Sequence, residues 1–520
     1  MTETSMAVAF GSVIGAASLL AAFARRFHHS DDLPSLGGWA LAHRSLGPGW
    51  TWLLLGGTMF TSYTFTAVPG LVYAEGAPGF FALAYTVIVC PLAFTLLPRL
   101  WRVAHRHGYV TAADFVRGRY GSPPLALMVA LTGILATMPY LALQLLGIEA
   151  VLEAAALGPG GGYGDLLVVA LFAGIAVATY RHGLRAPTVI SALKALAVLG
   201  SIVALVTLAL TRLGGTGPVF DAAARRLAAR ASGDASLMLA PHQQGAFATL
   251  ALGSALALLM YPHVLTAGFA ATGPDALRRA SVALPAWTAV LGLFGTLGLA
   301  ALAAGVFTPP GRAEAAVPLL VDQLMPTVLA GLVFGAITVG ALVPAAVLSI
   351  GAAASFARDI YAEYFQPTAT PKRQVRIARV ATLAVKAGAV AVAFGLRDQE
   401  AVNLQLLGGV WILQIFPAVA IGLYTRRLHH RALLAGWAAG MVAGTAMAVT
   451  QGFSAVVPLT FGGHDLEVYA GLAAVLLNLG VAVVFTVVFD RAGTPRGTDA
   501  TALPSRLIAG HHIERGTSGS

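Results

Sequence analysis

The sequence predicts an all-α integral membrane protein, and hydropathy, charge content and glycine content are the observations that predict it. Of the 520 residues, 57% are hydrophobic and only 10% are charged, and the mean hydropathy is +0.78. A soluble domain carries about 25% charged residues, so this composition indicates a chain that lies in a bilayer. The 59 glycines suit a bundle of membrane helices, where small residues let backbones approach closely.

Windows of about 20 apolar residues predict about thirteen membrane-spanning helices. They lie near residues 6–24, 50–73, 79–98, 124–156, 165–180, 188–211, 245–267, 281–305, 326–356, 379–396, 404–423, 432–450 and 468–489. Since this number is odd, we expect the two termini on opposite sides of the membrane.

Positive charge marks the cytoplasmic side of a membrane protein. The first span ends in Arg25 and Arg26, and most of the 32 lysine and arginine residues fall in loops on the same predicted side. We therefore expect the amino terminus outside and the carboxyl terminus in the cytoplasm. The same asymmetry explains the net charge of +10 without a nucleic-acid partner.

The sequence contains no recognisable enzyme active-site motif. Cys90 is the only cysteine, which excludes an intrachain disulfide and a cysteine-rich metal site. The patterns His-Glu-x-x-His and Gly-x-Ser-x-Gly are also absent. We expect no enzyme activity, no catalytic residue, no metal site and no prosthetic cofactor. A solute sensor is a further alternative, but the segment after Asp490 is too short for a kinase.

Several strings resemble the sodium/solute symporter family. They are Gly108-Tyr-Val-Thr-Ala-Ala-Asp-Phe115, Arg119-Tyr-Gly-Ser122 and Ala357-Arg-Asp-Ile-Tyr361. Others resemble the bacterial monocarboxylate permease branch of that family, whose members take up pyruvate, lactate, acetate or propionate. These are Pro139-Tyr-Leu-Ala-Leu-Gln-Leu-Leu-Gly147, Tyr261-Pro-His263 and Asn403-Leu-Gln-Leu-Leu-Gly-Gly-Val-Trp-Ile-Leu-Gln414.

The resemblance implies a LeuT-like fold of two five-helix inverted repeats, with one extra helix before them and two after. On this mapping residues 1–49 hold the first helix and a cytoplasmic loop. Residues 50–211 form the first repeat, 212–244 an extracellular loop, 245–423 the second repeat and 424–489 the last two helices. Asp221–Arg230 in the loop is a predicted surface helix, and residues 490–520 are a predicted disordered tail.

The resemblance also points to an altered cation site. Family members hold a sodium ion partly with two adjacent hydroxyl residues upstream of the Ala-Arg-Asp string. The corresponding residues here are Val343 and Pro344, near Gly340, and they have no side-chain oxygen. In this fold the fifth and eighth core helices meet at that site, and Lys194 lies in the fifth. Its ammonium is a candidate replacement for the ion; the alternative is a lysine that snorkels to the cytoplasm. The branch usually places an aspartate after this lysine, and here the residue is Ala195.

On this mapping each repeat begins with a helix that carries helix-breaking residues at mid-depth, Gly56–Thr64 and Met260–His263. Unwound backbone in a membrane is tolerated only where it lines a cavity, and half-helix amino ends favour an anionic substrate. The candidate substrate-binding residues are Thr58, Thr61, Ser62, Thr64, Tyr140, Gln144, Tyr261, His263, Gln405, Trp411 and Gln414. The alternative is that these side chains only pack the helices together or, for His263, serve as a structural hydrogen-bond donor.

The predicted function is import of a short-chain monocarboxylate together with a cation, by alternating access, in a bacterial inner membrane. The expected partners are the small acid, the co-transported H⁺ or Na⁺ and the lipid bilayer, and a monomer suffices. The missing hydroxyls and Lys194 favour protons. Sodium coupling remains the alternative, since backbone carbonyls and hydroxyls such as Thr58, Thr61 or Ser349 offer oxygen ligands.

Overall fold

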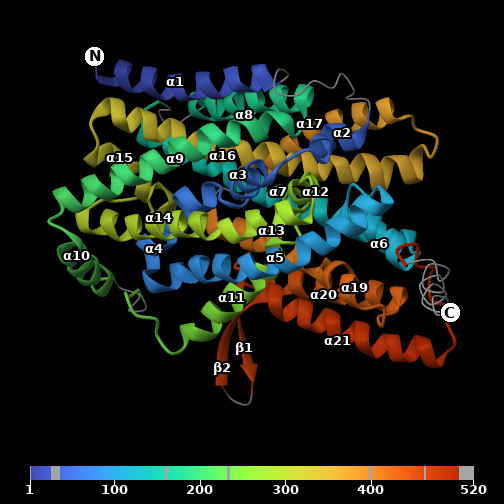
Figure 1. The fold of residues 1–520 in the computed structure, drawn as a ribbon. Coiled ribbons are helices and arrows are strands. Elements are labelled where there is room, and N and C mark those ends of the chain that lie inside the picture. The colour runs from blue at the N-terminus through green and yellow to red at the C-terminus, as the bar shows by residue number, and fades with distance from the viewer. Residues whose placement is uncertain are drawn as a thin grey trace, which may run out of the picture.

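The computed structural model describes residues 2–24, 35–157, 162–230, 235–396, 401–461 and 464–502. Most helices run roughly side by side along one axis (Figure 1). Helix α1 (Thr2–Phe23) lies along one edge of the bundle, and α20 (His430–Thr450) packs on α21 (Ala470–Arg491) at another edge. The predicted all-α membrane class is confirmed, although Arg25 and Arg26 lie outside the described residues.

Ten helices among the described residues are long and apolar enough to cross a membrane, or eleven if one bent pair forms a single span. The bent pair is α11 (Gln243–Leu258) and α12 (Pro262–Phe269). Two further predicted spans correspond to α8 (Gly162–His182) and to a broken helix over residues 48–75. The total of about thirteen spans stays a prediction.

The other helical elements lie between these landmarks. They are α2 (Leu36–Leu41), η2 (Ala42–Arg44), α3 (Pro48–Met59), η3 (Tyr63–Ala67), α4 (Val68–Glu75), η4 (Ala77–Phe80), α5 (Phe81–His107), α6 (Ala112–Tyr120), α7 (Pro123–Ala154), α9 (Arg185–Arg212), α10 (Thr216–Ala228), α13 (Pro274–Ala283), α14 (Pro285–Ala304), η5 (Ala313–Ala315), α15 (Ala316–Leu324), α16 (Thr327–Ser355), η6 (Phe356–Phe365), α17 (Pro371–Gly395), α18 (Ala401–Ile412), η7 (Leu413–Ile415), η8 (Pro417–Ile421) and α19 (Gly422–Tyr424).

Local sequence signals explain several of these boundaries. Proline occupies the first position of α7, α13, α14 and α17, where its missing N–H is no loss. Thr370 caps α17 by accepting a hydrogen bond from the amide of Arg373. Helix α5 ends at Gly108, whose φ of +67° is the left-handed conformation that glycine adopts without strain.

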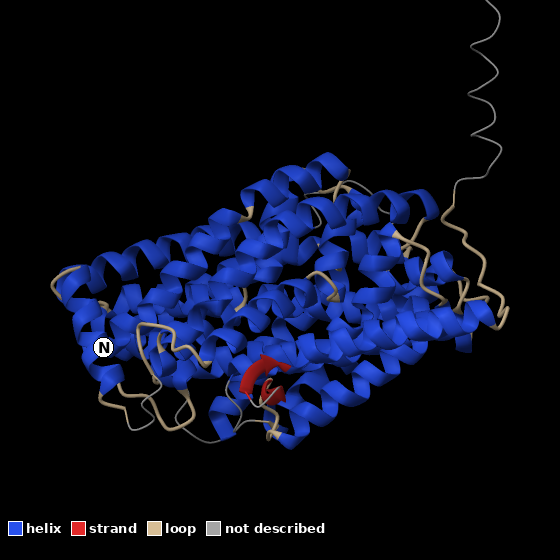
Figure 2. Cartoon of the chain, turned by 90° about the horizontal axis from the view of Figure 1, so that it is seen from below, coloured by secondary structure: helices blue, strands red, loops and turns tan. Residues whose placement is uncertain are grey.

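A β-hairpin joins α20 to α21, and the sequence analysis did not predict it. Strand β1 (Val456–Phe461) pairs antiparallel with β2 (His464–Tyr469), with Val456 opposite Tyr469 (Figure 2). Tyr469 is fully buried, and its hydroxyl donates a hydrogen bond to the carbonyl of Leu406 at 2.8 Å. The hairpin is therefore anchored to α18.

The predicted surface helix within residues 212–244 is confirmed as a helix, α10. Its apolar face, formed by Val219, Ala223 and Leu227, is buried, and α10 packs against α14. At the opposite end of the molecule, part of the tail that was predicted to be disordered is attached to α6. Asp499 pairs with Arg119 at 3.0 Å, and the amide of Ala500 donates to the carbonyl of Gly118. Residues 503–520 of that tail lie outside the described residues.

Candidate functional site

Two helices are interrupted at the centre of the bundle. Helix α3 ends at Met59, Phe60 is extended with φ −100° and ψ 102°, and the chain becomes helical again at η3. Helix α11 ends at Leu258, and α12 begins at Pro262 with a bend of 49°. These are the two positions where the sequence predicted broken helices, and each interruption leaves backbone polar groups without their helical partners.

Lys194 is buried between the first break and α16. Its ammonium donates hydrogen bonds to the carbonyl oxygens of Gly57 at 2.8 Å, Phe60 at 2.6 Å and Gly340 at 3.0 Å. The side chain is fully buried, and Nζ lies 5.4 Å from the centre of the Phe65 ring. An ammonium has three N–H donors, and here each donor has one acceptor. Lys194 therefore does not snorkel to the membrane surface.

Pro344 explains why the carbonyl of Gly340 is available to Lys194. In a helix this carbonyl accepts a hydrogen bond from the amide four residues later, and Pro344 has no amide hydrogen. Gly340 must also be small, because a Cβ there would lie 2.5 Å from the Phe65 ring. Val343 is buried in the same wall, next to Gly57. All four predicted cation-site residues thus meet at one place.

A second cluster surrounds the second break. The rings of Tyr140, Tyr261 and His263 contact one another, with centroid separations between 5.2 and 5.4 Å. The Tyr261 hydroxyl faces the carbonyl of Gln405 at 3.4 Å. Among the described residues, the Tyr140 hydroxyl, both His263 nitrogens and the Gln405 Oε1 are buried without a hydrogen-bond partner.

Gln144 connects this second cluster to the first break. Its Oε1 accepts from the amide of Ser62 at 3.1 Å, and its Nε2 donates to Thr61 Oγ1 at 3.3 Å and to the carbonyl of Tyr140. The Ser62 hydroxyl is buried without a partner among the described residues. We call Ser62, Tyr63, Tyr140, His263 and Gln405, with their unpaired polar atoms, the polar cluster.

Seven of the eleven predicted substrate residues are not members of the polar cluster. Thr61, Gln144 and Tyr261 adjoin it, and the other four are Thr58, Thr64, Trp411 and Gln414. Thr58 is buried and donates to the carbonyl of Leu55, and Thr64 is buried within η3. Trp411 donates from Nε1 to Thr445 at 3.1 Å and so faces α20. Gln414 donates to the carbonyl of Val410 and accepts from Asn478 of α21 at 3.2 Å.

Sequence reasoning missed three aromatic residues at the centre. The Tyr63 hydroxyl is buried and unpartnered among the described residues, and the Tyr63 ring lies 6.0 Å from that of Tyr85. Tyr85 is fully buried, and its hydroxyl lies near the Gln405 side chain. Phe65 lies over Lys194. The available signal was a tyrosine in mid-span, since its hydroxyl needs a polar neighbour when buried.

The strings that carried the family resemblance contact each other at one end of the bundle. Thr111 donates to Asp359 at 3.0 Å, and Arg358 donates from Nε to Asp114 at 3.1 Å. Thr111 also accepts from the amide of Asp114 and so caps α6. These bonds attach α6 to the end of the long helix that carries Gly340 and Pro344.

At the other end, Arg312 joins three carboxylates. It lies 2.7 Å from Glu314, 3.5 Å from Glu149 and 3.3 Å from Glu153, which links the loop before α15 to α7. Glu314 is buried, and burial raises the pKa of its carboxyl while Arg312 opposes that shift. Gly70 of α4 allows this loop to approach, because a Cβ there would lie 2.6 Å from the carbonyl oxygen of Ala313.

Arg312→Gln is expected to loosen this end of the molecule. A half-buried network with one cation and three carboxylates loses its only positive charge, which destabilises the closed loop by about 1–3 kcal/mol. Amide hydrogen exchange in residues 306–316 should therefore accelerate about fivefold or more. Arg278→Gln is the control, because Arg278 pairs with Asp275 on the surface and contributes little. Equal exchange in both variants would contradict the role of Arg312 in holding the loop before α15 against α7.

Comparisons with known proteins show the family and the fold of this chain. The sequence model of the sodium:solute symporter family matches residues 39–440. A monocarboxylate transport permease of Rhizobium johnstonii is 44% identical over 461 residues, 89% of this chain and 92% of that protein. The uncharacterized symporter YodF of Bacillus subtilis is 31% identical over 461 residues, 87% of either chain.

Among solved structures, a Na⁺-coupled sialic acid symporter in a substrate-bound outward-open state matches with a TM-score of 0.75. It is 14% identical, and the match covers 95% of this chain and 98% of that chain. This likeness confirms the predicted transporter fold. The family match and the fold together show a transport protein rather than an enzyme, and the chain belongs to the sodium:solute symporter family.

Proposed function

We propose that the protein imports short-chain monocarboxylates, such as pyruvate, lactate, acetate and propionate, together with a proton by alternating access. The observation that carries the proposal is the Lys194 ammonium, held by three backbone carbonyls between the broken helix α3 and α16. The 44% identity to a monocarboxylate transport permease supports the substrate class.

The polar cluster supports an anionic substrate of small size. Ser62, Tyr63 and Tyr140 offer hydroxyl donors, His263 offers a ring N–H, and among the described residues these groups have no partner. An unsatisfied buried donor or acceptor costs about 1–3 kcal/mol, so several in one place indicate a site that is satisfied when a ligand binds. A carboxylate accepts several hydrogen bonds and matches this set of donors.

Lys194 supports protons over sodium as the coupling ion. A sodium ion at this place would be coordinated by oxygens, and the three carbonyls that point inward are already bonded to the ammonium. The protonated amine has three donors for three acceptors, whereas the neutral amine has only two. A conformational change that moves α3 away from α16 separates these acceptors, which favours release of the proton. Rebinding of the proton restores the closed arrangement.

Sodium coupling is the second candidate for the ion. The Thr58 hydroxyl donates to the carbonyl of Leu55 and the Ser349 hydroxyl donates to that of Ala345, which leaves the lone pairs of both oxygens able to coordinate a cation. Thr61 is used by Gln144 and by the amide of Tyr63. Sodium that used the carbonyls of Gly57, Phe60 and Gly340 would have to displace the Lys194 ammonium.

The proposal also specifies the membrane in which the protein acts and which end of the molecule faces the cytoplasm. The protein acts in a bacterial inner membrane, with the Arg312 network outside and the Asp114–Arg358 network in the cytoplasm. One chain contains both breaks, the Lys194 site and the polar cluster, so a monomer is sufficient for transport.

Uptake of labelled pyruvate, lactate, acetate and propionate into proteoliposomes tests the proposal. We expect accumulation under an inward proton gradient without sodium, and loss of accumulation when a protonophore is added. Because anion and proton cross together as a neutral acid, accumulation should depend weakly on membrane potential. Accumulation only under an inward sodium gradient at equal pH would reject proton coupling. Failure to accumulate any of the acids under either gradient would reject the substrate class.

A further inference from the structure

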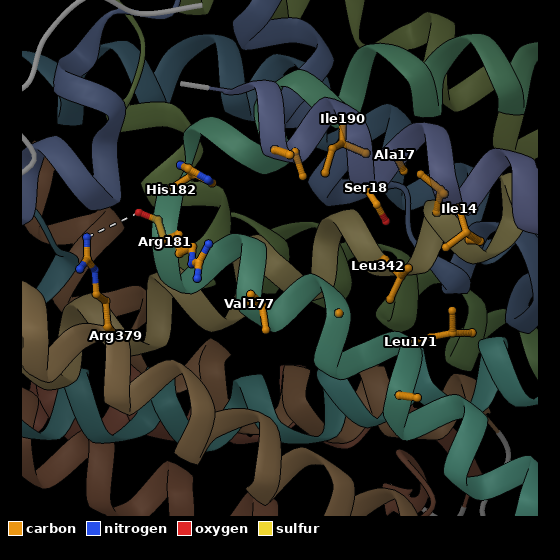
Figure 3. Close-up of a pocket in the computed structure, with 15 residues that line it drawn as sticks. Ile14, Ala17, Ser18, Leu171, Val177, Arg181, His182, Ile190, Leu342 and Arg379 are labelled. Atoms are coloured by element: carbon orange, nitrogen blue, oxygen red, sulfur yellow. Dashed lines mark hydrogen bonds between the residues drawn. The ribbon is translucent and has the colours of Figure 1, made fainter. Parts of the chain in front are cut away.

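A slot with a volume of about 650 Å³ lies among α1, α8, α9, α16 and α17 (Figure 3). No residue of the polar cluster is among the described residues that line it. Helices α1 and α8 form its two sides over their carboxyl-terminal halves. Ile190 of α9 with Val339 and Leu342 of α16 form its back wall. The remaining apolar lining comes from Ile14, Ala17, Ala21, Ala22, Leu171 and Val177.

The chemistry changes along the slot. Apart from Ser18 of α1, the part between α1 and α16 is lined by aliphatic side chains, and the far end holds Arg181, His182 and Arg379 (Figure 3). Arg379 donates to the carbonyl of Arg181 at 3.5 Å, and its guanidinium lies 5.6 Å from the centre of the Tyr180 ring. Its Nε is buried without a hydrogen-bond partner among the described residues. A long apolar slot thus ends at a basic site with unused donor capacity.

We propose that this slot binds an anionic phospholipid. One acyl chain lies along the aliphatic walls, and the phosphate group contacts Arg181 and Arg379. Basic pockets between membrane helices on the cytoplasmic side are suited to acidic head groups, and arginine matches phosphate with paired N–H donors. Arg181 and His182 are the last residues of α8, and Arg379 of α17 contacts this end. The charge distribution predicts that this end of α8 faces the cytoplasm, where the head groups of the inner leaflet lie.

The slot also borders the Lys194 site. Its back-wall residues Ile190 and Val339 belong to a small apolar cluster that includes Val343. An acyl chain in the slot therefore packs against the side chains that separate Lys194 from the bilayer. The bound lipid completes the apolar shell on this side of the cation site, whichever solute is transported.

Native mass spectrometry of the purified protein with added phosphatidylglycerol or phosphatidylcholine tests the head-group end. We expect one phosphatidylglycerol bound in preference to phosphatidylcholine. Each arginine contributes about fivefold, so Arg181→Gln/Arg379→Gln should weaken phosphatidylglycerol binding about twentyfold. Arg376→Gln is the matched control, because Arg376 is exposed on the same helix outside the slot. If the double variant fails to fold, Arg181→Gln alone serves, since Arg181 is already exposed.

Filling the slot tests the acyl-chain end independently. Gly174 lines the slot, and a Cβ there meets no atom within 4 Å, so Gly174→Phe should enter the slot without a clash and displace the lipid. Gly200→Phe is the control on the neighbouring α9, where a Cβ also meets no atom within 4 Å. Equal binding of the two lipids, or unchanged binding in both test variants, would overturn the proposal. Competition between pyruvate and the lipid would instead assign the slot to the solute and overturn it too.

Discussion

Lys194→Ala is expected to abolish accumulation of monocarboxylate under a proton gradient. The substitution removes the ammonium that connects the carbonyls of Gly57 and Phe60 to that of Gly340, so Lys194 can no longer take up a proton at this place. Uptake of labelled pyruvate into proteoliposomes should fall to the level of empty liposomes. The amount of protein inserted in the liposomes should stay the same.

Two further variants separate charge from packing. Lys194→Met keeps the length and bulk of the side chain without the ammonium, and it should lose accumulation as completely as the alanine variant. Lys386→Met is the matched control, because Lys386 is also a buried lysine within a span and its ammonium has no hydrogen-bond partner among the described residues. Normal accumulation by Lys194→Met would show that the ammonium has only a structural role.

The sequence predicted where the two helices are interrupted, but not which backbone carbonyls the first interruption offers to Lys194. Glycine and hydroxyl residues marked the first interruption and Pro262 marked the second, and the family resemblance placed Lys194 near the eighth core helix. The acceptors of its hydrogen bonds are backbone carbonyls, which carry no sequence signature. Pro344 was read as a residue that lacks an oxygen, whereas its missing N–H is what releases the carbonyl of Gly340. That step required the three-dimensional position of Lys194.

Helix rotation explains why some candidate residues are separated. Gln405 and Gln414 are nine residues apart, which at 3.6 residues per turn places them on roughly opposite faces of a helix. The Gln405 side chain lies near the Tyr85 hydroxyl, and the Gln414 side chain accepts from Asn478 of α21. Trp411 likewise faces α20 through Thr445. The rotation of a helix that is buried on most sides follows from its neighbours, and a uniformly apolar sequence does not specify it.

The segment after residue 490 shows that composition alone does not predict order that comes from ion pairs with distant residues. Composition predicted a disordered segment after residue 490, because glycine, threonine and charged residues cannot form a core. Residues up to 502 are nevertheless held by Asp499, which is almost fully buried between Arg119 and Arg426. Ion pairs between segments 380 residues apart in the sequence are set by the fold.

His263→Phe is expected to weaken substrate binding and to stabilise the folded protein at the same time. Phenylalanine keeps a ring against Tyr140 and Tyr261 but removes both nitrogens, which are buried without partners among the described residues. Loss of a hydrogen bond to a carboxylate should raise the apparent KM for pyruvate about 10- to 100-fold. Removal of unsatisfied polar atoms should raise the free energy of unfolding by about 1–3 kcal/mol.

The opposite signs of these two effects distinguish a binding residue from a structural donor. A structural histidine has its hydrogen bonds within the protein, so its replacement lowers stability and changes affinity little. A residue kept unsatisfied for a ligand behaves in the reverse way, because its polar atoms are matched only in the complex. Tyr140→Phe should follow the same pattern, since its hydroxyl is also unpartnered among the described residues. Trp411→Phe should leave KM unchanged, because Trp411 faces Thr445. Lower stability with unchanged KM for His263→Phe would assign His263 to packing and leave the tyrosines as the donors to the carboxylate.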